Sequence, residues 1–315
     1  MKKVVDNTRL MIKVCDLYYN QNISQQEIGK QLNLSRPTVS RLLSSARELG
    51  IVQIRIPNLE AVKYWEIERQ IEEKYKLKDV MIVDAQSNHD QLLDKLGRAA
   101  ANYISYIIKS DDKVGISMGS TLYQMTKHIY KPAARNVTFI PLIGGLGQLR
   151  TELHSNSLAE SLAKVYNGSF TPIYAPARVS SISIRNELMR EEAMAKPIQL
   201  MKDLDVAIVG IGYPNDRSSI SATGYFKENE MDELIKKDVA GDICMQFFDE
   251  NGDTKPFKND NFVVGININK LKKVPISIGI AGGIEKLPSI KGAIRGGFIN
   301  RLITDIQCAS LLASE

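Results

Sequence analysis

Residues 24–43, SQQEIGKQLNLSRPTVSRLL, constrain the fold more than any other stretch, because they predict two short helices joined by a tight turn. Ser24 is followed three residues later by Glu27, the capping-box spacing in which each side chain accepts a hydrogen bond from the other residue's backbone at a helix start. Asn33 favours the turn, and Pro37 falls in the first turn of the second helix, where its missing N–H costs nothing. The stretch therefore predicts a helix-turn-helix.

The second of these helices has an apolar face and a polar face. The apolar face consists of Val39, Leu42, Leu43 and Ala46. The outward face carries Arg36, Thr38, Ser40, Arg41, Ser44 and Arg47, and we predict that these six residues bind DNA. Arginines contact guanine or neutralise phosphates, and small hydroxyls allow a close approach to the major groove. An ordinary helical hairpin with a solvated outer face is the alternative.

The distribution of charge favours DNA binding over that alternative. Residues 1–56 contain nine Lys or Arg and four Asp or Glu, whereas the rest of the chain contains 32 of each. The formal net charge of +5 therefore belongs entirely to the segment that holds the candidate recognition helix. Such an asymmetry is typical of a domain that binds a polyanion.

A length of 315 residues predicts two domains. The first, residues 1–57, adds an N-terminal helix ending near Asn20 to the helix-turn-helix and finishes with a short alternating strand at 51–56. The second, residues 58–315, opens with a charged helix at 59–76. This connecting helix is either a dimerising linker or a helix packed on its own domain, and the sequence leaves both open.

The sequence predicts a cytoplasmic protein that carries neither a metal nor a cofactor. No apolar run approaches the roughly 18 residues that cross a bilayer, and the first residues do not lead into a signal peptide. The three cysteines, Cys15, Cys244 and Cys308, lie far apart and lack CxxC spacing. We therefore expect reduced thiols in the core.

After residue 80 the pattern changes to β-rich runs that alternate with helical patterns. The predicted strands are 80–83, 113–117, 137–142, 169–174, 205–211, 241–248, 262–266, 275–280 and 298–303. The predicted helices between them are 92–108, 122–130, 158–166, 231–237 and 284–295. This alternation predicts an α/β domain with a doubly wound, largely parallel sheet.

A loop of small residues follows the second predicted strand and leads into a helix. Parallel α/β sheets bind ligands outside the carboxyl ends of their strands. The backbone amides of Gly119, Ser120 and Thr121, the hydroxyl of Ser117 and the positive end of the helix together predict a phosphate cradle. A tight turn without a ligand is the alternative.

Three further glycine turns fall at equivalent strand ends. They are IGGLGQ at 143–148, GIGY at 210–213 and AGG at 281–283, and the last leads to Lys286. If they converge on one edge of the sheet, these turns line one cleft, and Lys286 can reach an anion in it. A purely structural turn is again the alternative for each.

Five stretches spread along nearly the whole chain carry a specific resemblance. They are ISQQEIGKQLNLSRPTVSRLL at 23–43, VGISMGSTL at 114–122, PLIGGLGQ at 141–148, GDICMQFFDENG at 241–252 and AGGIEKLPSIKGAIRGGFINRLITD at 281–305. Together they resemble the SorC family of bacterial sugar-responsive transcription regulators. The resemblance implies an effector domain similar to sugar-phosphate isomerases, a regulator of carbohydrate-metabolism genes that binds operator DNA, and a homotetramer. We predict a repressor that its effector releases from DNA, although an activator would use the same parts with opposite sign.

The same resemblance implies roles for residues of the effector domain. The Gly119 loop and Lys286 would hold the ligand phosphate, Asp242 would accept hydrogen bonds from sugar hydroxyls, and Gly145 and Gln148 would border the ligand. Combined with the turn glycines, the predicted effector-binding set is Ser117, Gly119, Ser120, Thr121, Gly144, Gly145, Gln148, Gly212, Asp242 and Lys286.

One departure from the family pattern bears on the ligand. Ile143 stands where relatives that resemble bisphosphate binders carry a basic side chain. A second phosphate there would lack its counter-charge, at a cost of several kcal/mol in a dry site. We therefore expect a monophosphorylated sugar or polyol, unless Arg178 or Arg217 swings in.

An enzyme that carries a DNA-binding head is the alternative function. A sugar-phosphate isomerase or deaminase needs a general acid and a general base at the sugar carbonyl. The deaminase pattern would place an Asp and a His just after the turn at 210–212, but residues 213–216 are YPND. None of the three histidines, His89, His128 and His154, stands there. We therefore predict a regulator without catalytic residues.

Overall fold

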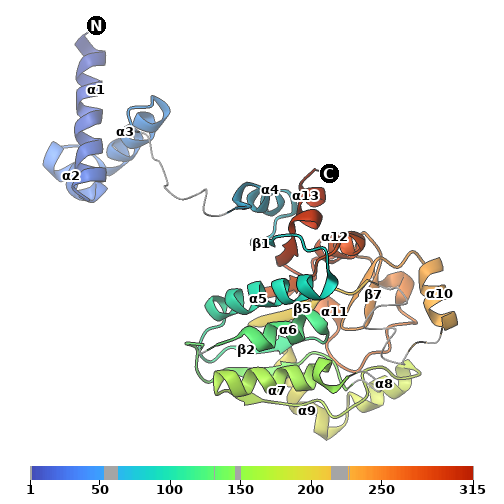
Figure 1. The fold of residues 1–315 in the computed structure, drawn as a ribbon. Helices are drawn as coiled ribbons and strands as arrows, with labels where there is room; N and C mark the ends of the chain where they lie inside the picture. The colour runs from blue at the N-terminus through green and yellow to red at the C-terminus, as the bar shows by residue number, and fades with distance from the viewer. Residues whose placement is uncertain are drawn as a thin grey trace. The chain divides into compact units, whose positions relative to one another are not determined.

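The computed structural model describes residues 2–52, 63–130, 132–145, 150–213, 226 and 228–314. The chain divides into two compact units, Met1–Lys63 and Tyr64–Glu315, each with its own hydrophobic core. Figure 1 traces both units. The predicted domain boundary at residue 57 lies outside the described residues.

The N-terminal unit contains three helices around one small core. They are α1 (Lys2–Cys15), which continues as a π-helical segment (Asp16–Asn20), α2 (Gln25–Leu32) and α3 (Arg36–Glu48). The predicted capping box is present: Ser24 Oγ accepts from the Glu27 N–H at 3.3 Å, and Glu27 Oε2 accepts from the Ser24 N–H at 3.2 Å. Val39 of α3 is fully buried in the core, as the apolar face of this helix predicts.

The turn between α2 and α3 explains why this hairpin is tight. Asn33 takes the left-handed conformation, with φ of 55°, and ends α2. The Leu34 N–H donates to the Gly29 carbonyl at 2.8 Å. A Cβ atom on Gly29 would lie 2.7 Å from the Leu34 carbonyl oxygen, so only glycine lets the turn fold back this closely.

The C-terminal unit is built on a parallel sheet of seven strands in the order β1-β9-β8-β5-β2-β3-β4. The strands are β1 (Asp79–Val83), β2 (Lys113–Ile116), β3 (Thr138–Pro141), β4 (Ser169–Phe170), β5 (Val206–Gly210), β8 (Ile276–Ile280) and β9 (Arg301–Asp305). From β2 the chain proceeds to β3 and β4 on one side, and then to β5 and β8 on the other. The order of strands therefore reverses between β2 and β5, which confirms the predicted doubly wound sheet.

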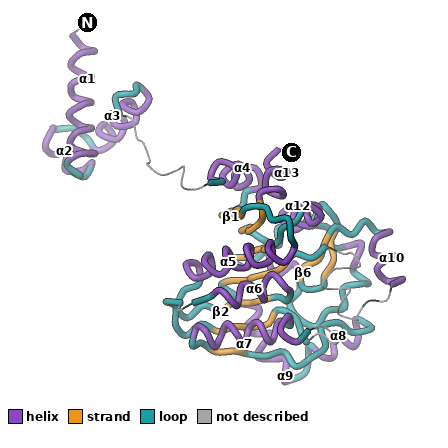
Figure 2. Tube along the Cα trace, in the orientation of Figure 1, coloured by secondary structure: helices purple, strands orange, loops and turns teal. Residues whose placement is uncertain are grey.

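Helices cover both faces of the sheet (Figures 1 and 2). On one face lie α5 (His89–Ile107), α6 (Ser120–His128) and α7 (Ser155–Tyr166), and on the other lie α9 (Glu192–Lys202), α11 (Ile268–Leu271), α12 (Leu287–Arg295) and α13 (Ile306–Ser314). Along β5, the side chains of Val206 and Ile208 pack in the core on the face of α5, α6 and α7. Those of Ala207 and Val209 pack in the core on the opposite face of the sheet. This alternation is the pleat of a strand buried on both faces.

Several predicted elements were wrong or missing. The predicted strand at 241–248 is a separate antiparallel hairpin of β6 (Gly241–Ile243) and β7 (Gln246–Phe248). The predicted strand at 262–266 forms only isolated bridges. The sequence patterns also missed α9, α13 and α8 (Ile182–Leu188), whereas the predicted helix at 231–237 corresponds to α10 (Glu228–Lys236).

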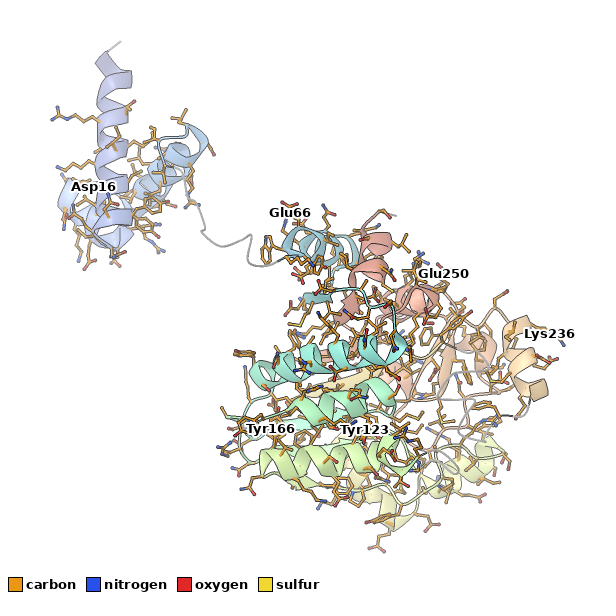
Figure 3. All side chains as sticks on the ribbon, in the orientation of Figure 1. Asp16, Glu66, Tyr123, Tyr166, Lys236 and Glu250 are labelled. Atoms are coloured by element: carbon orange, nitrogen blue, oxygen red, sulfur yellow. The ribbon has the colours of Figure 1, made fainter. Side chains whose placement is uncertain are left out.

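The connecting helix packs on its own unit in the form of α4 (Trp65–Tyr75). Glu68 Oε1 accepts from the Ile82 N–H and Glu72 Oε1 accepts from the Val80 N–H, both at 2.9 Å. Charged side chains such as Glu66, labelled in Figure 3, lie on its exposed side. The packing is that of a helix belonging to the C-terminal unit. Residues 59–62 of the predicted helix lie outside the described residues.

All three cysteines are buried free thiols, as predicted. Within the described ranges, no helix is long and apolar enough to cross a membrane. Over the same residues, no three His, Cys, Asp or Glu side chains are grouped as a metal would require.

Candidate ligand-binding cleft and DNA-binding helix

A cleft of about 530 Å³ opens at the carboxyl ends of β2 and β5, where the strand order reverses. Open α/β sheets bind ligands at this place, because the loops on either side of the reversal diverge and leave a crevice. Its walls comprise residues 117–122 after β2, residues 210–213 after β5, Asp242 and Cys244 of the β6–β7 hairpin, Ile280, Glu285 and Lys286 after β8, and His89.

The loop after β2 presents the start of α6 to the cleft. Gly119 has φ of 129°, a conformation that side chains rarely allow, and no side chain caps the first turn of α6. The N–H groups of a first helical turn have no partner within the helix and carry partial positive charge. Ser117 is buried and its Oγ accepts from the Gly210 N–H at 3.0 Å, so this hydroxyl joins the ends of β2 and β5.

Asp242 lies at the floor of the cleft with one unsatisfied oxygen. Its backbone pairs with Gly212 in both directions, at 2.9 and 3.2 Å. Its Oδ2 accepts from the Met245 N–H at 3.1 Å, whereas its Oδ1 has no hydrogen-bond partner among the described residues. A Cβ on Gly212 would collide with this Oδ1, so a larger residue there would require the Asp242 carboxyl to move. Burial raises the pKa of Asp242 to about 7, although the Met245 N–H and Lys286 act to lower it.

Lys286 enters the same cleft from the turn that follows β8. Its Nζ donates to the Ile211 carbonyl at 3.2 Å. Burial lowers the pKa of Lys286, while the carboxyls of Asp242 and Glu285 act to raise it. A lysine held by a single carbonyl has donors left for an anion.

The structure brings seven of the ten predicted effector-binding residues onto the walls of this cleft. They are Ser117, Gly119, Ser120, Thr121, Gly212, Asp242 and Lys286. Gly144 and Gly145 do not line it, contrary to the predicted convergence of all four turns. A Cβ on Gly144 would lie 2.5 Å from the Ala175 carbonyl oxygen, so this glycine permits close backbone packing. Gln148 lies outside the described residues.

Arg178 does not line the cleft either. Its guanidinium stacks on Phe226 at 4.3 Å and bonds to Glu230 at 3.2 Å, so it is held elsewhere. Arg217 lies outside the described residues.

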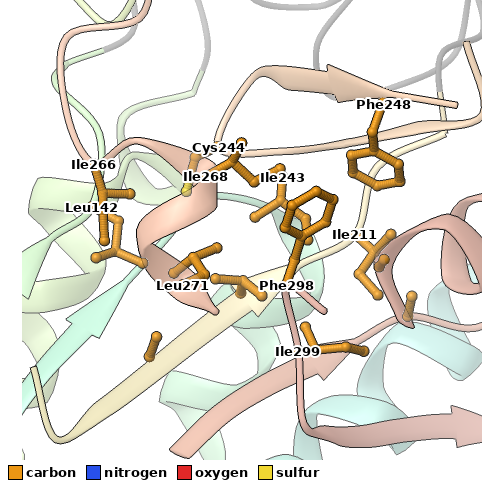
Figure 4. Close-up of a cluster of buried hydrophobic side chains, with 14 of the residues drawn as sticks. Leu142, Ile211, Ile243, Cys244, Phe248, Ile266, Ile268, Leu271, Phe298 and Ile299 are labelled. Carbon is orange, nitrogen blue, oxygen red and sulfur yellow. The ribbon is translucent and has the colours of Figure 1, made fainter. Parts of the chain in front are cut away.

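Nine of the described wall residues lie outside the predicted effector-binding set: His89, Met118, Leu122, Gly210, Ile211, Tyr213, Cys244, Ile280 and Glu285. Cys244 belongs to the buried apolar cluster of Figure 4, which also contains Ile211 and Ile243. It reaches the cleft through a two-residue turn in which Cys244 and Met245 both have positive φ, 54° and 58°. Such turns normally contain Asn or Gly, and neither Cys nor Met indicates one.

The candidate DNA-binding face is exposed on α3. Arg36, Ser40, Arg41 and Ser44 are exposed to solvent, and Pro37 lies in the first turn as predicted. Thr38 is partly buried, and its hydroxyl shares a hydrogen bond of 2.8 Å with the N-cap Ser35. Arg47 is exposed, but its Nε donates to Tyr19 Oη at 3.1 Å.

Known protein families match both units of the chain. Residues 60–313 match the family described as "Putative sugar-binding domain", and residues 13–48 match sigma-70 region 4. The chain is 32% identical to the sorbitol operon regulator of Klebsiella pneumoniae over 98% of both chains. It is 31% identical to the deoxyribonucleoside regulator of Bacillus subtilis, covering 98% of this chain and 99% of that one.

A solved structure gives the same result for the fold. The crystal structure of the full-length sorbitol operon regulator from Klebsiella pneumoniae superimposes with a TM-score of 0.73, covering 97% of this chain and 98% of that one. These relatives are named as regulators and not as enzymes. The chain therefore belongs to the SorC family of sugar-responsive transcription regulators, and it is a DNA-binding regulator whose second unit is a sugar-binding domain.

Proposed function

We propose that this regulator binds a phosphorylated sugar or polyol in the cleft between β2 and β5, and that the ligand weakens its hold on operator DNA. The observation that carries the proposal is the meeting of three features in one cleft. These are the uncapped first turn of α6, the partly free Lys286 and the unpaired Oδ1 of Asp242. Helix N-termini and lysines bind phosphate, and a buried polar atom needs a partner.

In this proposal the phosphate lies on the loop of Gly119, Ser120 and Thr121, within reach of Lys286. The sugar hydroxyls lie toward Asp242, and Gly212 leaves room for its carboxyl. With Ile143 apolar and Arg178 held by Glu230, the cleft favours one phosphate over two. The names of the relatives support a sugar ligand without identifying it.

On the DNA side, we propose that Arg36, Ser40, Arg41 and Ser44 contact the operator, with Thr38 and Arg47 at the edges of the same face. One recognition helix covers only a few base pairs, so specificity requires two or more copies and a symmetric operator. We therefore propose a homo-oligomer, a tetramer by its family. We also propose that the protein acts in the cytoplasm, where operator DNA is found.

A thermal-shift panel tests the ligand proposal. The full chain is heated with sugar monophosphates, sugar bisphosphates and the corresponding free sugars. We expect at least one monophosphate to raise the melting temperature, and its free sugar to have a much smaller effect. A panel in which only free sugars stabilise the protein would refute the phosphate site.

A further inference from the structure

The carboxyl group of Asp242 is poorly equipped to carry a negative charge. Asp242 is only 6% exposed, and in the described part of the chain a single N–H, that of Met245, donates to its carboxyl group. Oδ1 has no partner among the described residues. Buried carboxylates normally need several donors or a paired cation, and otherwise they take up a proton.

The charged groups around Asp242 do not provide the paired cation that a buried carboxylate with few hydrogen-bond donors needs. The titratable groups that share its cleft in the described structure are Lys286, Glu285, Cys244, Tyr213 and His89. Lys286 directs its Nζ to the Ile211 carbonyl, and no ion pair joins it to Asp242. On α12, which packs against β6, Lys291 pairs with Glu250 at 3.6 Å. The balance of burial against these groups raises the pKa of Asp242 to about 7.

An anion entering this cleft changes that balance further. A phosphate or sulfate close to Asp242 repels a carboxylate and attracts the Lys286 ammonium, so it favours the protonated acid. The neutral acid gains an O–H donor, which the ionised group lacks. Oδ1, the oxygen without a partner, can then donate to a ligand oxygen.

We propose that the cleft takes up its anionic ligand together with one proton from solvent, and that Asp242 holds this proton as a neutral carboxylic acid. The inference rests on the proposed function only in that the ligand is an anion bound in this cleft. It adds a role to Asp242, which becomes a donor to the ligand, and it makes ligand affinity depend on pH.

Sulfate is the probe for the test, because its own charge does not change between about pH 6 and about pH 8.5. Sulfate binding to the full chain is measured by calorimetry across this range. We expect the dissociation constant to be nearly constant below pH 6 and to rise by about tenfold per pH unit above pH 7. At pH 8, titrations in buffers of different ionisation enthalpy should show uptake of about one proton per sulfate.

Three variants locate the proton. D242N, which has a neutral side chain of similar shape, should bind sulfate with no dependence on pH and no proton uptake. H89Q removes the imidazole from the cleft wall, and the rise of the dissociation constant above pH 7 and the proton uptake should both persist in it, whatever its absolute affinity for sulfate. E160Q removes an exposed carboxyl of α7 that pairs with Lys164, and it is the matched control with an unchanged profile.

The outcomes separate this inference from the proposed function. Sulfate binding of equal strength at every pH, or a pH dependence that survives in D242N, overturns the proton inference and leaves the anion site in place. No sulfate binding at any pH overturns both. The proton count comes from the wild-type protein, so the evidence that a proton is taken up does not depend on how well D242N folds.

Discussion

Asp242 also makes the stability of the ligand-free protein depend on pH. The pKa of this carboxyl rises from 3.8 to about 7 on folding, so the folded state binds more protons between these values. The free energy of unfolding therefore falls as the pH rises from about 4 to about 7. A shift of roughly 3 pKa units corresponds to at most about 4 kcal/mol. Lys286, whose pKa burial lowers, acts in the opposite direction at higher pH.

The first prediction follows from this fall in the free energy of unfolding with rising pH. In urea unfolding at about pH 5 and about pH 7.5, wild type should lose 1 to 4 kcal/mol more stability with rising pH than D242N does. E160Q, which lacks only an exposed carboxyl, should follow wild type. Equal pH profiles for wild type and D242N would mean that Asp242 is already ionised at low pH in the folded state.

The second prediction concerns Ser120, the first residue of α6. Ser120→Asp places a carboxylate where the ligand phosphate is expected, and like charges in a poorly solvated loop repel by more than thermal energy. Stabilisation by sugar phosphates in a thermal-shift assay should vanish while operator binding persists. Ser157→Asp is the matched control, because it adds the same charge to the first turn of α7, outside the cleft. A response retained in S120D would place the phosphate elsewhere.

Residue-level features were predictable where the signal was local. The spacing of Ser24 and Glu27 sufficed for the capping box, because both partners lie within one helical turn. The close packing at Gly144 was not predictable, because the backbone that crowds it, at Ala175, comes some thirty residues later in the chain. His89 was not recognised as a wall residue for the same reason, since only the folded sheet brings the start of α5 to the cleft.

At the scale of elements, α4 protects an exposed edge of the sheet. β1 is an edge strand, and edge N–H groups without partners invite pairing with other chains. Residues four apart on a helix rise by about 6 Å, close to the spacing of about 6.6 Å between alternate residues of a strand. Glu68 and Glu72 therefore match the N–H groups of Ile82 and Val80. Burial raises the pKa of both carboxyls. Burying their negative charge therefore opposes the packing of α4 on β1, and the hydrogen bonds to the two N–H groups favour it.

The third prediction tests this arrangement. E68A and E72A should each lose about 1–3 kcal/mol in urea unfolding, because each leaves a strand N–H without its acceptor. E68Q and E72Q keep an amide oxygen in place and should lose much less. E73A removes only an exposed ion pair with Arg69 and should cost less than about 0.5 kcal/mol. Hydrogen exchange at Val80 and Ile82 should accelerate in the alanine variants alone, and unchanged exchange there would contradict the role of the carboxylates.

The fourth prediction concerns α3. Arg41→Ala should weaken operator binding by about 1–3 kcal/mol and relax the sequence preference at one position, if Arg41 contacts a base. Arg98→Ala removes an arginine from α5 of the other unit and should leave operator affinity unchanged. An equal loss on specific and non-specific DNA would assign Arg41 to a phosphate.

Elements were predictable where periodicity alone defines them, as in α3, α5 and the central strands. The β6–β7 hairpin was misread as one strand, because its turn has Cys244 and Met245 in left-handed conformations that these residue types do not signal. The turn is held by tertiary contacts, including the bond from the Met245 N–H to Asp242. α9 was missed although it contains a regular pattern, because Pro197 lies inside it.

At the scale of the whole molecule, the alternation of strands and helices predicted the doubly wound sheet, but not the order of its strands. The order requires knowing that β9 inserts between β1 and β8, which joins segments more than two hundred residues apart. That pairing places the end of β1 and the start of α5 near the cleft. The position of the cleft nevertheless followed from the glycine loop after β2, because the reversal of strand order lies beside it.

Regulation requires the ligand to distinguish two states of the whole molecule. A ligand changes operator affinity only by the ratio of its affinities for the DNA-binding state and the other state. In the cleft, the loop after β2, the turn after β5 and Lys286 come from separate segments, and a ligand that contacts all three favours the state in which they are closest. A coupling of about 1–3 kcal/mol would weaken operator binding by roughly 5- to 150-fold.

The fifth prediction separates ligand binding from this coupling. Lys286→Ala removes a charged donor from the cleft and should raise the sugar phosphate concentration for half-maximal DNA release by roughly 10- to 100-fold, from a charged hydrogen bond of about 1.5–3 kcal/mol. Operator affinity without ligand should stay at the wild-type value, because Lys286 lies in the effector unit and has no part in reading DNA. Lys273→Ala, an exposed lysine outside the cleft, is the control and should behave as wild type. Operator titrations with increasing sugar phosphate measure both quantities. If a sugar phosphate binds wild type but leaves its operator affinity unchanged at saturation, the two states have equal affinity for that ligand, and the cleft binds it without acting as a switch.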